Sequence, residues 1–520
     1  MSTSMRSPAA GEQNAVVIGA GVGGLATAID LACAGLQVTL VEQAPTPGGK
    51  LRPVRIGNAW LDAGPTVFTM RGAFEELFAD AGERLEDHLR LRPVERLARH
   101  AWVEGGQLDL FADPRQSAEA IGEFAGPAEA RRFRAFCRRA AEIHDTLDNT
   151  FMRAQRTTPL GLFHRVGYRN LGAMLRISPF TTLWQALGRY FHDSRLRQLY
   201  GRYATYCGSS PFEAPATLML IAHVESEGVW QVEGGMHRLA TALAGLAERC
   251  GVELRCATRA RAIQTARGRV SGVELAHGEF LPAGTVVSNG DAAALASGLF
   301  GDHLRSAVRR QPPRTRSQSA ITWNWRAETG GFPLHHHSVF FSSDYADEFQ
   351  AVFRRGEPPP EPTVYICAQD RHDQQSVAGP ERLLCLINAP AQGDRKSFSD
   401  TEIQQCQHQT LSLLERCGLS IQPTEETPVI HTPTDFEARY PATGGALYGM
   451  ASHGWRASFQ RPAARTRVPG LYLAGGSTHP GAGLPMAMMS GRLAAAQVLA
   501  DLTSVTRSLR GATSGGTSTP

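Results

Sequence analysis

Three glycines near the start of the chain, Gly19, Gly21 and Gly24, have the spacing of the G-x-G-x-x-G turn that binds dinucleotides. In such a turn the first glycine permits a tight bend, the second lets backbone N–H groups approach a pyrophosphate, and the third packs a helix against a strand. Glu42 follows eighteen positions beyond Gly24, where a carboxylate can accept hydrogen bonds from both hydroxyls of an adenosine ribose. The spacing predicts a dinucleotide site, and the acid disfavours a cofactor with a 2′-phosphate.

The elements expected around these residues are those that would position them. The apolar run 15–18 has the length of a buried parallel strand, and a helix is expected over 25–33. The helix N-terminus would present unpaired N–H groups and partial positive charge to the phosphates. A second strand, expected over 37–41, leads directly to Glu42. A structural turn is the alternative, but it would not require a strand, a helix and an acid in this order.

A second glycine pair, Gly48 and Gly49, precedes Lys50. Nothing in a nicotinamide dehydrogenase requires a glycine pair at this place. The segment resembles two-domain flavoproteins of the glutathione reductase and amine oxidase families, in which such a pair follows the ribose acid and lies near the FAD diphosphate. The resemblance favours FAD over NAD as the cofactor.

A third glycine-rich stretch lies near the other end of the chain. A strand expected over 471–474 runs into Gly475 and Gly476, and a loop rich in Gly and Pro then leads to a helix over 486–502. Loop glycines leave room for a cofactor, and a helix N-terminus can offset negative charge that develops on a reduced flavin. A simple loop before a terminal helix is the alternative interpretation.

Two other groups of residues are less specific. Gly64 and Thr66 lie in a small-residue turn that could let the backbone approach a flat ring, although an ordinary tight turn explains them equally well. His335, His336 and His337 invite a metal interpretation. Neighbours in an extended run point to opposite faces, so three consecutive histidines rarely ligate one ion. We expect a loop or the lining of a polar pocket instead of a metal site.

Composition limits the class of protein. With 520 residues the chain is too long for one core, so two or more domains are expected. Hydrophobic residues make up 42% and charged residues 20%, and a net charge of +4 without a dense basic run argues against nucleic acid as a partner. The nine cysteines have no CxxC or metal-binding spacing and are expected as reduced thiols in the cytoplasm. No run of about eighteen apolar residues occurs, so any membrane contact is expected to be peripheral.

We expect an α/β fold with a discontinuous, Rossmann-like FAD-binding domain and a substrate domain built from a mixed sheet and helices. The FAD-binding domain is expected to be discontinuous because a later strand, over 285–288, adds to a sheet that the N-terminal strands have begun. The expected segments are 14–88, 225–299 and 466–502 for the FAD-binding domain, 89–224 and 300–465 for the substrate domain, and 1–13 and 503–520 for flexible termini.

Residues 114–205 are expected to be mostly helical. Phe133, Phe136 and Ala140 recur at helical spacing, and arginines fill much of the remaining face. Such a stripe usually means a packed face with solvated arginines, and the alternative is a basic amphipathic surface resting on anionic lipid. The segment 159–179, rich in Leu, Phe, Ile and Met, could face a lipid or an apolar tunnel.

The two ends of the chain together resemble the bacterial phytoene-desaturase type of carotenoid desaturase. The stretches that carry this resemblance are GAGVGGLATAIDLACAGLQVTLVEQAPTPGGK, LDAGPTVFTM and LYLAGGSTHPGAGLPMAMMSGRLAAA. Within that family, the middle segments ARHAWVEGGQLDLFADP and HHHSVFFSSDYADEF look most like those of the 1-hydroxycarotenoid 3,4-desaturases, also called methoxyneurosporene dehydrogenases. The resemblance spans roughly residues 14–502.

This resemblance implies a FAD oxidoreductase with a long apolar tunnel for an acyclic carotenoid, attached peripherally to the cytoplasmic side of the bacterial inner membrane. Its electron acceptor would be oxygen or a quinone. The residues implied to contact the ADP half of FAD are Gly19, Gly21, Gly24, Glu42 and Lys50, with Gly49 near the diphosphate. Those implied to lie close to the flavin half are Gly64, Thr66, Gly475, Gly476 and Met486.

The expected chemistry does not demand a strong catalytic base, and we nominate none. Loss of hydride from an allylic carbon beside a long polyene leaves a cation that is spread over many carbons, so the protein's tasks are positioning and exclusion of water. We expect hydride transfer from C4 to flavin and proton loss from C3, which introduces the C3–C4 double bond. One or two polar residues at the closed end of the tunnel should select a hydroxyl or methoxyl end group, and His335, His336 and His337 are candidates.

Several rival functions share parts of this pattern. A phytoene desaturase that acts at several positions and a flavin-dependent carotene isomerase would use the same cofactor. A lipid-binding relative that resembles GDP-dissociation inhibitors would need neither Glu42 nor the Gly475–Gly476 loop. A soluble NAD-dependent dehydrogenase would not explain the second glycine pair or the C-terminal loop.

Overall fold

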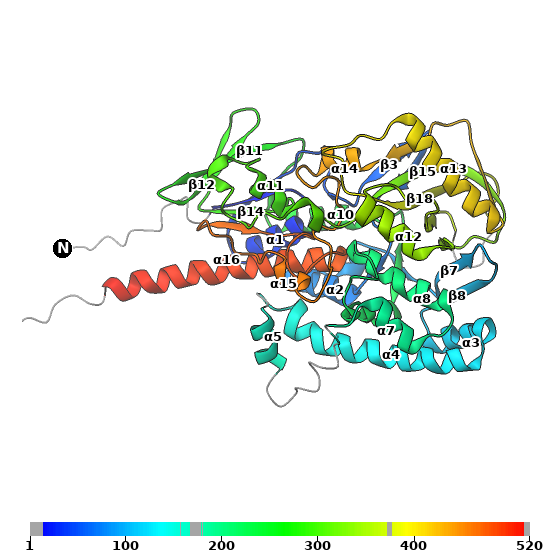
Figure 1. Cartoon of the computed structure of the whole chain (residues 1–520). Coiled ribbons are helices and arrows are strands. Elements are labelled where there is room, and N and C mark those ends of the chain that lie inside the picture. The colour runs from blue at the N-terminus through cyan, green and yellow to red at the C-terminus, as the bar shows by residue number, and fades with distance from the viewer. Residues whose placement is uncertain (1–13, 156–157, 167–177, 179, 372–376, 514–520) are drawn as a thin grey trace, which may run out of the picture.

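The structure of the chain, a computed structural model, describes residues 14–155, 158–166, 178, 180–371 and 377–513. Two sheets organise these residues, with the N-terminal and C-terminal elements gathered at one side and the second sheet at the other (Figure 1). The expected α/β class is confirmed, and the rest of the fold is built around these sheets.

The first sheet is parallel, and its five strands come from segments far apart in the sequence. Their order is β10–β2–β1–β14–β21, and every neighbouring pair is parallel. The strands are β1 (Asn14–Ile18), β2 (Gln37–Val41), β10 (Glu253–Arg255), β14 (Thr285–Ser288) and β21 (Leu471–Leu473). The apolar runs of the central strands follow from burial on both faces, as parallel sheets require. The domain boundaries remain a prediction, but the strands do lie in all three segments expected for the FAD-binding domain.

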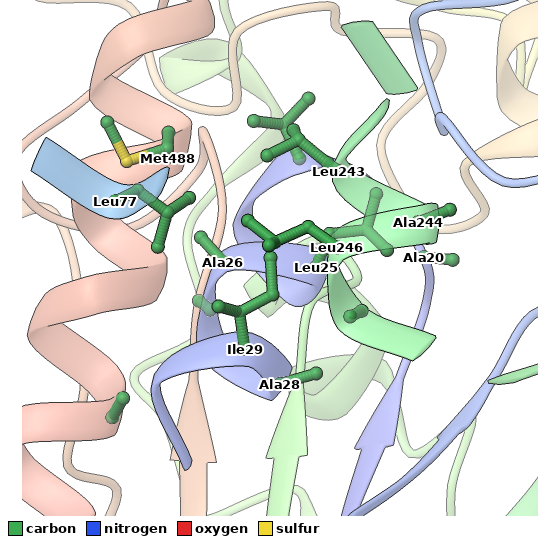
Figure 2. Close-up of a cluster of buried hydrophobic side chains, with 14 of the residues drawn as sticks. Ala20, Leu25, Ala26, Ala28, Ile29, Leu77, Leu243, Ala244, Leu246 and Met488 are labelled. Carbon is green, nitrogen blue, oxygen red and sulfur yellow. The ribbon is translucent and has the colours of Figure 1, made fainter. Parts of the chain in front are cut away.

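Three helices from distant segments pack together on one face of this sheet. They are α1 (Val22–Cys33), α10 (His237–Arg249) and α16 (Leu484–Thr513). Figure 2 shows Leu25 and Ile29 of α1 between Leu243 and Leu246 of α10 and Met488 of α16. The other face is covered by an antiparallel sheet of β11 (Ala260–Ala266), β12 (Arg269–Leu275) and β13 (Phe280–Pro282), in which Arg267 and Gly268 form the turn between β11 and β12.

The second sheet is mixed, as predicted. Its order is β19–β15–β18–β17–β16–β7–β8, with β20 paired to β15, and its β16–β7 pair is parallel. The strands are β7 (Arg96–Trp102), β8 (Gln107–Phe111), β15 (Ser319–Gly331), β16 (His337–Phe341), β17 (Val364–Ala368), β18 (Glu381–Ala389), β19 (Leu419–Pro423) and β20 (Val429–His431). Helix α13 (Asp400–Arg416) packs with the stacked rings of Trp323 and Trp325 from β15.

A group of helices packs at the β7–β8 end of this sheet. They are α3 (Pro114–Ala125), α4 (Pro127–Leu147), α7 (Leu183–Tyr190), α8 (Ser194–Gly201), the 3-10 segment η4 (Arg202–Cys207) and α9 (Leu220–Ser226). Helix α5 (Pro159–Val166) lies at the other end of α4 (Figure 1). Phe133 and Phe136 of α4 are buried against Tyr200, so the helical stripe is a packed face. No helix in the described ranges is both long and apolar enough to span a bilayer.

Smaller elements connect the two sheets. They are the β3 (Pro53–Ile56) and β4 (Ala59–Asp62) hairpin, the sheet of β5 (Phe68–Thr69), β9 (Val229–Val232) and β6 (Leu91–Pro93), and the helices α2 (Arg71–Asp80), α11 (Ala292–Ser297), α12 (Tyr345–Gln350), α14 (Pro433–Arg439) and α15 (Ala457–Gln460).

The C-terminal helix is longer than the sequence suggested. Helix α16 continues to Thr513, so residues 503–513 of the expected flexible terminus are helical, while 1–13 and 514–520 lie outside the described residues. The reason is that extending an established helix adds one hydrogen bond per residue, and no proline interrupts this stretch. Helix α1 likewise begins at Val22, three positions before its expected start.

Candidate functional site

The first glycine turn lies between β1 and α1, at the carboxyl end of the parallel sheet. Gly19 has a φ of +99°, which favours glycine, and its N–H donates to the Val41 carbonyl at 2.8 Å. A β-carbon on Gly24 would lie 2.0 Å from the Gly19 carbonyl oxygen, and one on Gly21 would lie 2.8 Å from Asn289 Nδ2. A side chain at either position would therefore displace its neighbours.

Glu42 follows β2 at the same edge of the sheet and is 6% exposed. Its Oε2 accepts a hydrogen bond from the Ala20 N–H and its Oε1 accepts one from the Ala44 N–H, each at 2.8 Å. These two bonds fix the orientation of the carboxylate. Because each carboxylate oxygen can accept two hydrogen bonds, both retain a position for a ribose hydroxyl.

The second glycine pair packs directly on the first turn. The Gly48 N–H donates to the Ala20 carbonyl at 2.8 Å, and a β-carbon on Gly49 would lie 3.0 Å from Gly21 Cα. Lys50 Nζ donates to the Leu447 carbonyl. Surrounding protein desolvates the ammonium and lowers the pKa of Lys50 to about 8, although the side chain keeps a path to solvent.

The C-terminal glycine pair lies against the start of α1. Gly475 has a φ of +104°, and a β-carbon on Gly23 would lie 3.0 Å from Gly475 Cα. The Gly476 carbonyl accepts a hydrogen bond from Arg461 Nη1 at 3.1 Å. Met486 is half-buried in the first turn of α16. The two ends of the chain therefore meet at one place.

Asn289 joins these motifs and was not among the residues expected at the site. Its Nδ2 donates to the Gly19 carbonyl at 3.2 Å, and its Oδ1 would lie 2.7 Å from a β-carbon on either Gly23 or Gly475. It directly follows β14, and ligands of open parallel sheets bind beyond the carboxyl ends of the strands. That position is the sequence signal that could have found Asn289.

These residues fit a bound dinucleotide. Gly21 is the N-cap of α1 and makes no side-chain capping hydrogen bond, so the N–H groups of the first turn are left for a ligand. Around them is a surface of glycine backbone that any β-carbon would obstruct, with the Glu42 carboxylate beside it. Bound FAD would lie with its phosphates at this helix N-terminus and its ribose at Glu42.

Gly64 and Thr66 have different roles. A β-carbon on Gly64 would lie 1.9 Å from the Lys50 carbonyl oxygen, so close crossing of two chain segments explains this glycine. Thr66 Oγ1 hydrogen-bonds with Tyr365 Oη at 2.6 Å, and Tyr365 Oη also bonds with His337 Nδ1 at 2.8 Å. Thr66 thus links the segment expected beside the flavin to the second sheet.

A cavity with about 30 Å³ of space that water could enter lies beside this link, between the second sheet and the helices around α8. Its apolar walls are formed by Val67, Leu97, Leu110, Leu199, Val229 and Val339. Charged and phenolic groups of Arg202, Tyr206, Glu225 and Tyr365 also line it. A mainly apolar pocket with a few polar groups is typical of a small-molecule site.

The three consecutive histidines do not act as a unit. His337 lines the cavity, and burial lowers its pKa well below the ordinary value, so its imidazole is neutral. The expectation that neighbours point apart is wrong for His336 and His337, whose ring centroids are 4.5 Å apart, because β16 begins only at His337. His336, His337 and Cys367 each place one possible ligand atom within 4.8 Å of the others. His336 Nδ1 is hydrogen-bonded to the Arg371 carbonyl.

The parallel sheet, the glycine junction at which Gly19, Gly21 and Gly24 meet Gly48–Gly49 and Gly475–Gly476, and the mainly apolar cavity are those of a flavin-dependent oxidoreductase. The chain belongs to the flavin containing amine oxidoreductase family, which it matches over residues 22–499. This membership confirms FAD as the cofactor expected from the second glycine pair.

Relatives with known names extend this finding. The chain is 53% identical to a hydroxyneurosporene desaturase of Rubrivivax gelatinosus, over 97% of this chain and 96% of that protein. It is 44% identical to a hydroxyneurosporene desaturase of Rhodobacter capsulatus, over 94% of this chain and 98% of that protein. The resemblance to carotenoid desaturases is thereby confirmed.

Solved structures show the fold. Putrescine oxidase bound to putrescine has a TM-score of 0.57 at 15% identity, covering 94% of this chain and 99% of its own. Cyclohexylamine oxidase from Brevibacterium oxydans IH-35A has a TM-score of 0.56 at 16% identity, with the same coverage. The predicted architecture of the amine oxidase type is confirmed.

Proposed function

We propose that this chain is a FAD-dependent carotenoid desaturase that introduces the C3–C4 double bond into acyclic carotenoids with an oxygen function at C1. The observation that carries this proposal is the 53% identity, over nearly the whole chain, to a protein named hydroxyneurosporene desaturase. The cavity supports it, because apolar walls suit a polyene end and the polar groups suit an end that carries oxygen.

When bound, FAD supplies the hydride acceptor for this oxidation. The residues of the chain supply positioning and a dry environment. Leu199, Val229 and Val339 line the cavity and would keep water from the delocalised carbocation of the substrate. Because that cation is spread over the polyene, proton loss from C3 does not need a strong base, and the neutral His337 imidazole and the phenol groups would suffice as acceptors or relays.

The substrate dissolves in membranes, and we include peripheral attachment to the cytoplasmic side of a bacterial inner membrane in the proposal. Leu160 of α5 and Phe180 expose 78% and 76% of their surface, which is unusual for large apolar side chains. Helix α4, which runs between α3 and the α5 region (Figure 1), carries exposed arginines in its first half, including Arg131 and Arg134, and these would favour anionic lipid. Residues 167–177 and 179 of the expected lipid-facing stretch lie outside the described residues.

The experiment is product analysis with the FAD-loaded protein and vesicles that contain either 1-hydroxyneurosporene or phytoene. We expect the hydroxylated substrate alone to lose two hydrogens and to absorb at longer wavelength, and deuterium at C4 to slow the reaction. Conversion of phytoene at several positions, or a colour change without loss of hydrogen, would instead favour one of the rival enzymes.

The same vesicles also test the remaining parts of the proposal. Flotation should carry the protein with anionic vesicles, and its absence from the floated fraction would contradict peripheral attachment. Parallel reactions with oxygen alone and with a quinone under anaerobic conditions distinguish the two possible electron acceptors.

A further inference from the structure

One part of the cavity is lined by a cluster of polar side chains from three elements. Arg202 and Tyr206 come from η4, Glu225 comes from α9, and Tyr365 comes from β17. The cavity is otherwise apolar, and such groups are costly to bury unless each has a partner. The pattern of partners within the cluster therefore indicates which of its groups a ligand must satisfy.

Glu225 is held as a hydrogen-bond acceptor. It is 8% exposed, and Tyr203 Oη donates to its Oε2 at 2.6 Å. Tyr206 also interacts with this carboxyl group. Burial raises the pKa of the Glu225 carboxyl, and the two phenols and the charge of Arg202 oppose that rise.

Arg202 is held as a hydrogen-bond donor. Its Nη1 donates to Tyr206 Oη at 3.2 Å, and its guanidinium carbon lies 5.3 Å and 5.2 Å from the ring centroids of Tyr206 and Tyr365. The two rings hold the guanidinium from its sides. The Tyr206 hydroxyl that accepts from Arg202 is also hydrogen-bonded to the Glu225 carboxyl group, so it bridges the two charged groups, and both of them line the cavity.

A guanidinium has five N–H donors and a carboxylate has two acceptor oxygens, so the single bridge through Tyr206 leaves both groups with capacity for a cavity ligand that accepts and donates. A hydroxyl group can accept a hydrogen bond from the guanidinium and donate its own proton to the carboxylate. A methoxyl group can accept but has no proton to donate, and a hydrocarbon end can do neither. The arrangement therefore distinguishes the three possible end groups.

The carbon that the cluster would hold is only a few bonds from the carbons that react, so the cluster can direct the reaction. Tyr365 hydrogen-bonds to Thr66 at 2.6 Å, in the segment expected beside the flavin. In the substrate, C3 and C4 are the second and third carbons along from C1, which carries the oxygen. Fixing that oxygen therefore fixes the two carbons that lose hydrogen.

We propose that Arg202 and Glu225 form a subsite that binds the C1 hydroxyl of the carotenoid and selects it over a methoxyl or hydrocarbon end. The inference rests on the proposed function, since that function supplies the 1-hydroxycarotenoid as the ligand. Tyr203 and Tyr206 orient the two charged groups and are positioning residues. No bond is made or broken in this step.

The test compares the FAD-loaded wild type with Glu225→Gln and Arg202→Lys on 1-hydroxyneurosporene, its 1-methoxy analogue and neurosporene. Loss of one hydrogen bond to a charged group should lower kcat/KM for the hydroxylated substrate by roughly tenfold to a hundredfold. The values for neurosporene should change little, so that the preference for the hydroxyl is lost. A merely structural role would lower the values for all three substrates together.

Two tyrosines supply a gentler variant and its control. Tyr203→Phe removes only the hydroxyl that donates to Glu225 and should weaken the preference about threefold to tenfold. Tyr200→Phe, on the adjacent helix, removes a buried hydroxyl that has no hydrogen-bond partner among the described residues and should leave the preference unchanged. Flavin absorbance and melting temperature show whether each variant is folded and loaded.

Equilibrium binding of the three polyenes, read from quenching of tryptophan fluorescence, separates this inference from the proposed function. If wild type binds the hydroxylated polyene preferentially and Glu225→Gln does not, the subsite stands even when no desaturation occurs. If wild type desaturates the substrate and all three cluster variants keep the full preference, the proposed function stands and the subsite is overturned. Equal binding of the three polyenes by wild type also overturns it.

Discussion

The glycine junction and the cavity differ in which part of each residue faces the expected ligand: backbone at the junction and side chains in the cavity. At the junction an added β-carbon on Gly24 would lie 2.0 Å from the Gly19 carbonyl oxygen, and one on Gly21 or Gly23 would lie 2.8 or 2.7 Å from the Asn289 side chain, so these positions have no room for a side chain. In the cavity, recognition depends on large side chains, above all Arg202 and Glu225. Ligand binding at the cofactor site should therefore be weakened by substitutions that enlarge a side chain, and binding at the substrate site by substitutions that remove side-chain groups.

The strongest way to break this contrast is to add one methyl group at the junction. In Gly24→Ala the new carbon would lie 2.0 Å from the Gly19 carbonyl oxygen, where neither backbone segment can yield cheaply. We expect a colourless or insoluble protein, measured as flavin absorbance per chain after purification.

Gly72→Ala is the matched control for this variant. A β-carbon on Gly72, in α2, has no atom within 4 Å, and alanine favours a helix by about 1 kcal/mol relative to glycine. This variant should bind FAD normally and melt at the same or a higher temperature. Normal FAD content in Gly24→Ala would show that the junction is not a rigid backbone surface.

A smaller effect, on FAD affinity, is expected from replacing the Glu42 carboxylate at the junction. Glu42→Gln replaces one acceptor oxygen by a donating NH2 group that must face the N–H of Ala20 or Ala44. The amide nitrogen also cannot accept a hydrogen bond from a ribose hydroxyl, and losing one hydrogen bond to a charged group costs about 1.5–3 kcal/mol, so FAD affinity should fall roughly tenfold to a hundredfold, as measured by titration of the apoprotein. Glu253→Gln, a more exposed carboxylate on β10, should retain the wild-type affinity. Unchanged affinity in Glu42→Gln would mean that the cofactor does not use this acid.

The smallest effect concerns a buried carboxyl group of the substrate domain. Glu348 is 1% exposed and accepts hydrogen bonds from Thr363 Oγ1 at 2.6 Å and Asn388 Nδ2 at 2.7 Å. Burial raises its pKa from 4.5 to about 7. Between these values the folded chain binds more protons than the unfolded chain, so this group lowers the free energy of unfolding as pH rises, by at most about 1.4 kcal/mol per pH unit.

Glu348→Gln removes this titration. The melting temperature of the variant relative to wild type should therefore rise between pH 4.5 and 7 and stay level above that window. Differential scanning calorimetry over this range measures it. A difference that does not change with pH would show that Glu348 is ionised throughout in the folded chain.

The two regions also differ in how far the sequence could predict them. The strand, turn, helix and acid of the junction are consecutive, so their spacing reports their geometry, and β2 was predicted with its observed bounds. Asn289 was not predicted as a site residue because its partner Gly19 lies 270 positions away and no sequence motif marks it. The end of a predicted strand was the available signal.

The cavity could not be predicted from spacing. Thr66 and Tyr365 are 299 positions apart, and Arg202 and Glu225 come from different helical segments with no shared pattern. The sequence did indicate that polar residues should meet the end group, and it nominated the histidines, of which His337 lines the cavity. Which other side chains gather there depends on how the second sheet packs against the helices, and local propensity does not contain that information.

The late position of β21 and α16 has a consequence for biosynthesis. While the ribosome is still making the last part of the chain, β1, α1 and β2 already exist, but Thr27 of α1 lacks the Gly491 carbonyl that it contacts at 3.0 Å, and Ile29 lacks part of its apolar cover. The FAD-binding sheet therefore stays incomplete, with apolar surface exposed to aggregation, until translation ends. Loading with FAD is consequently a post-translational event, and its yield in a cell should depend on chaperone capacity and on the supply of free cofactor at that moment.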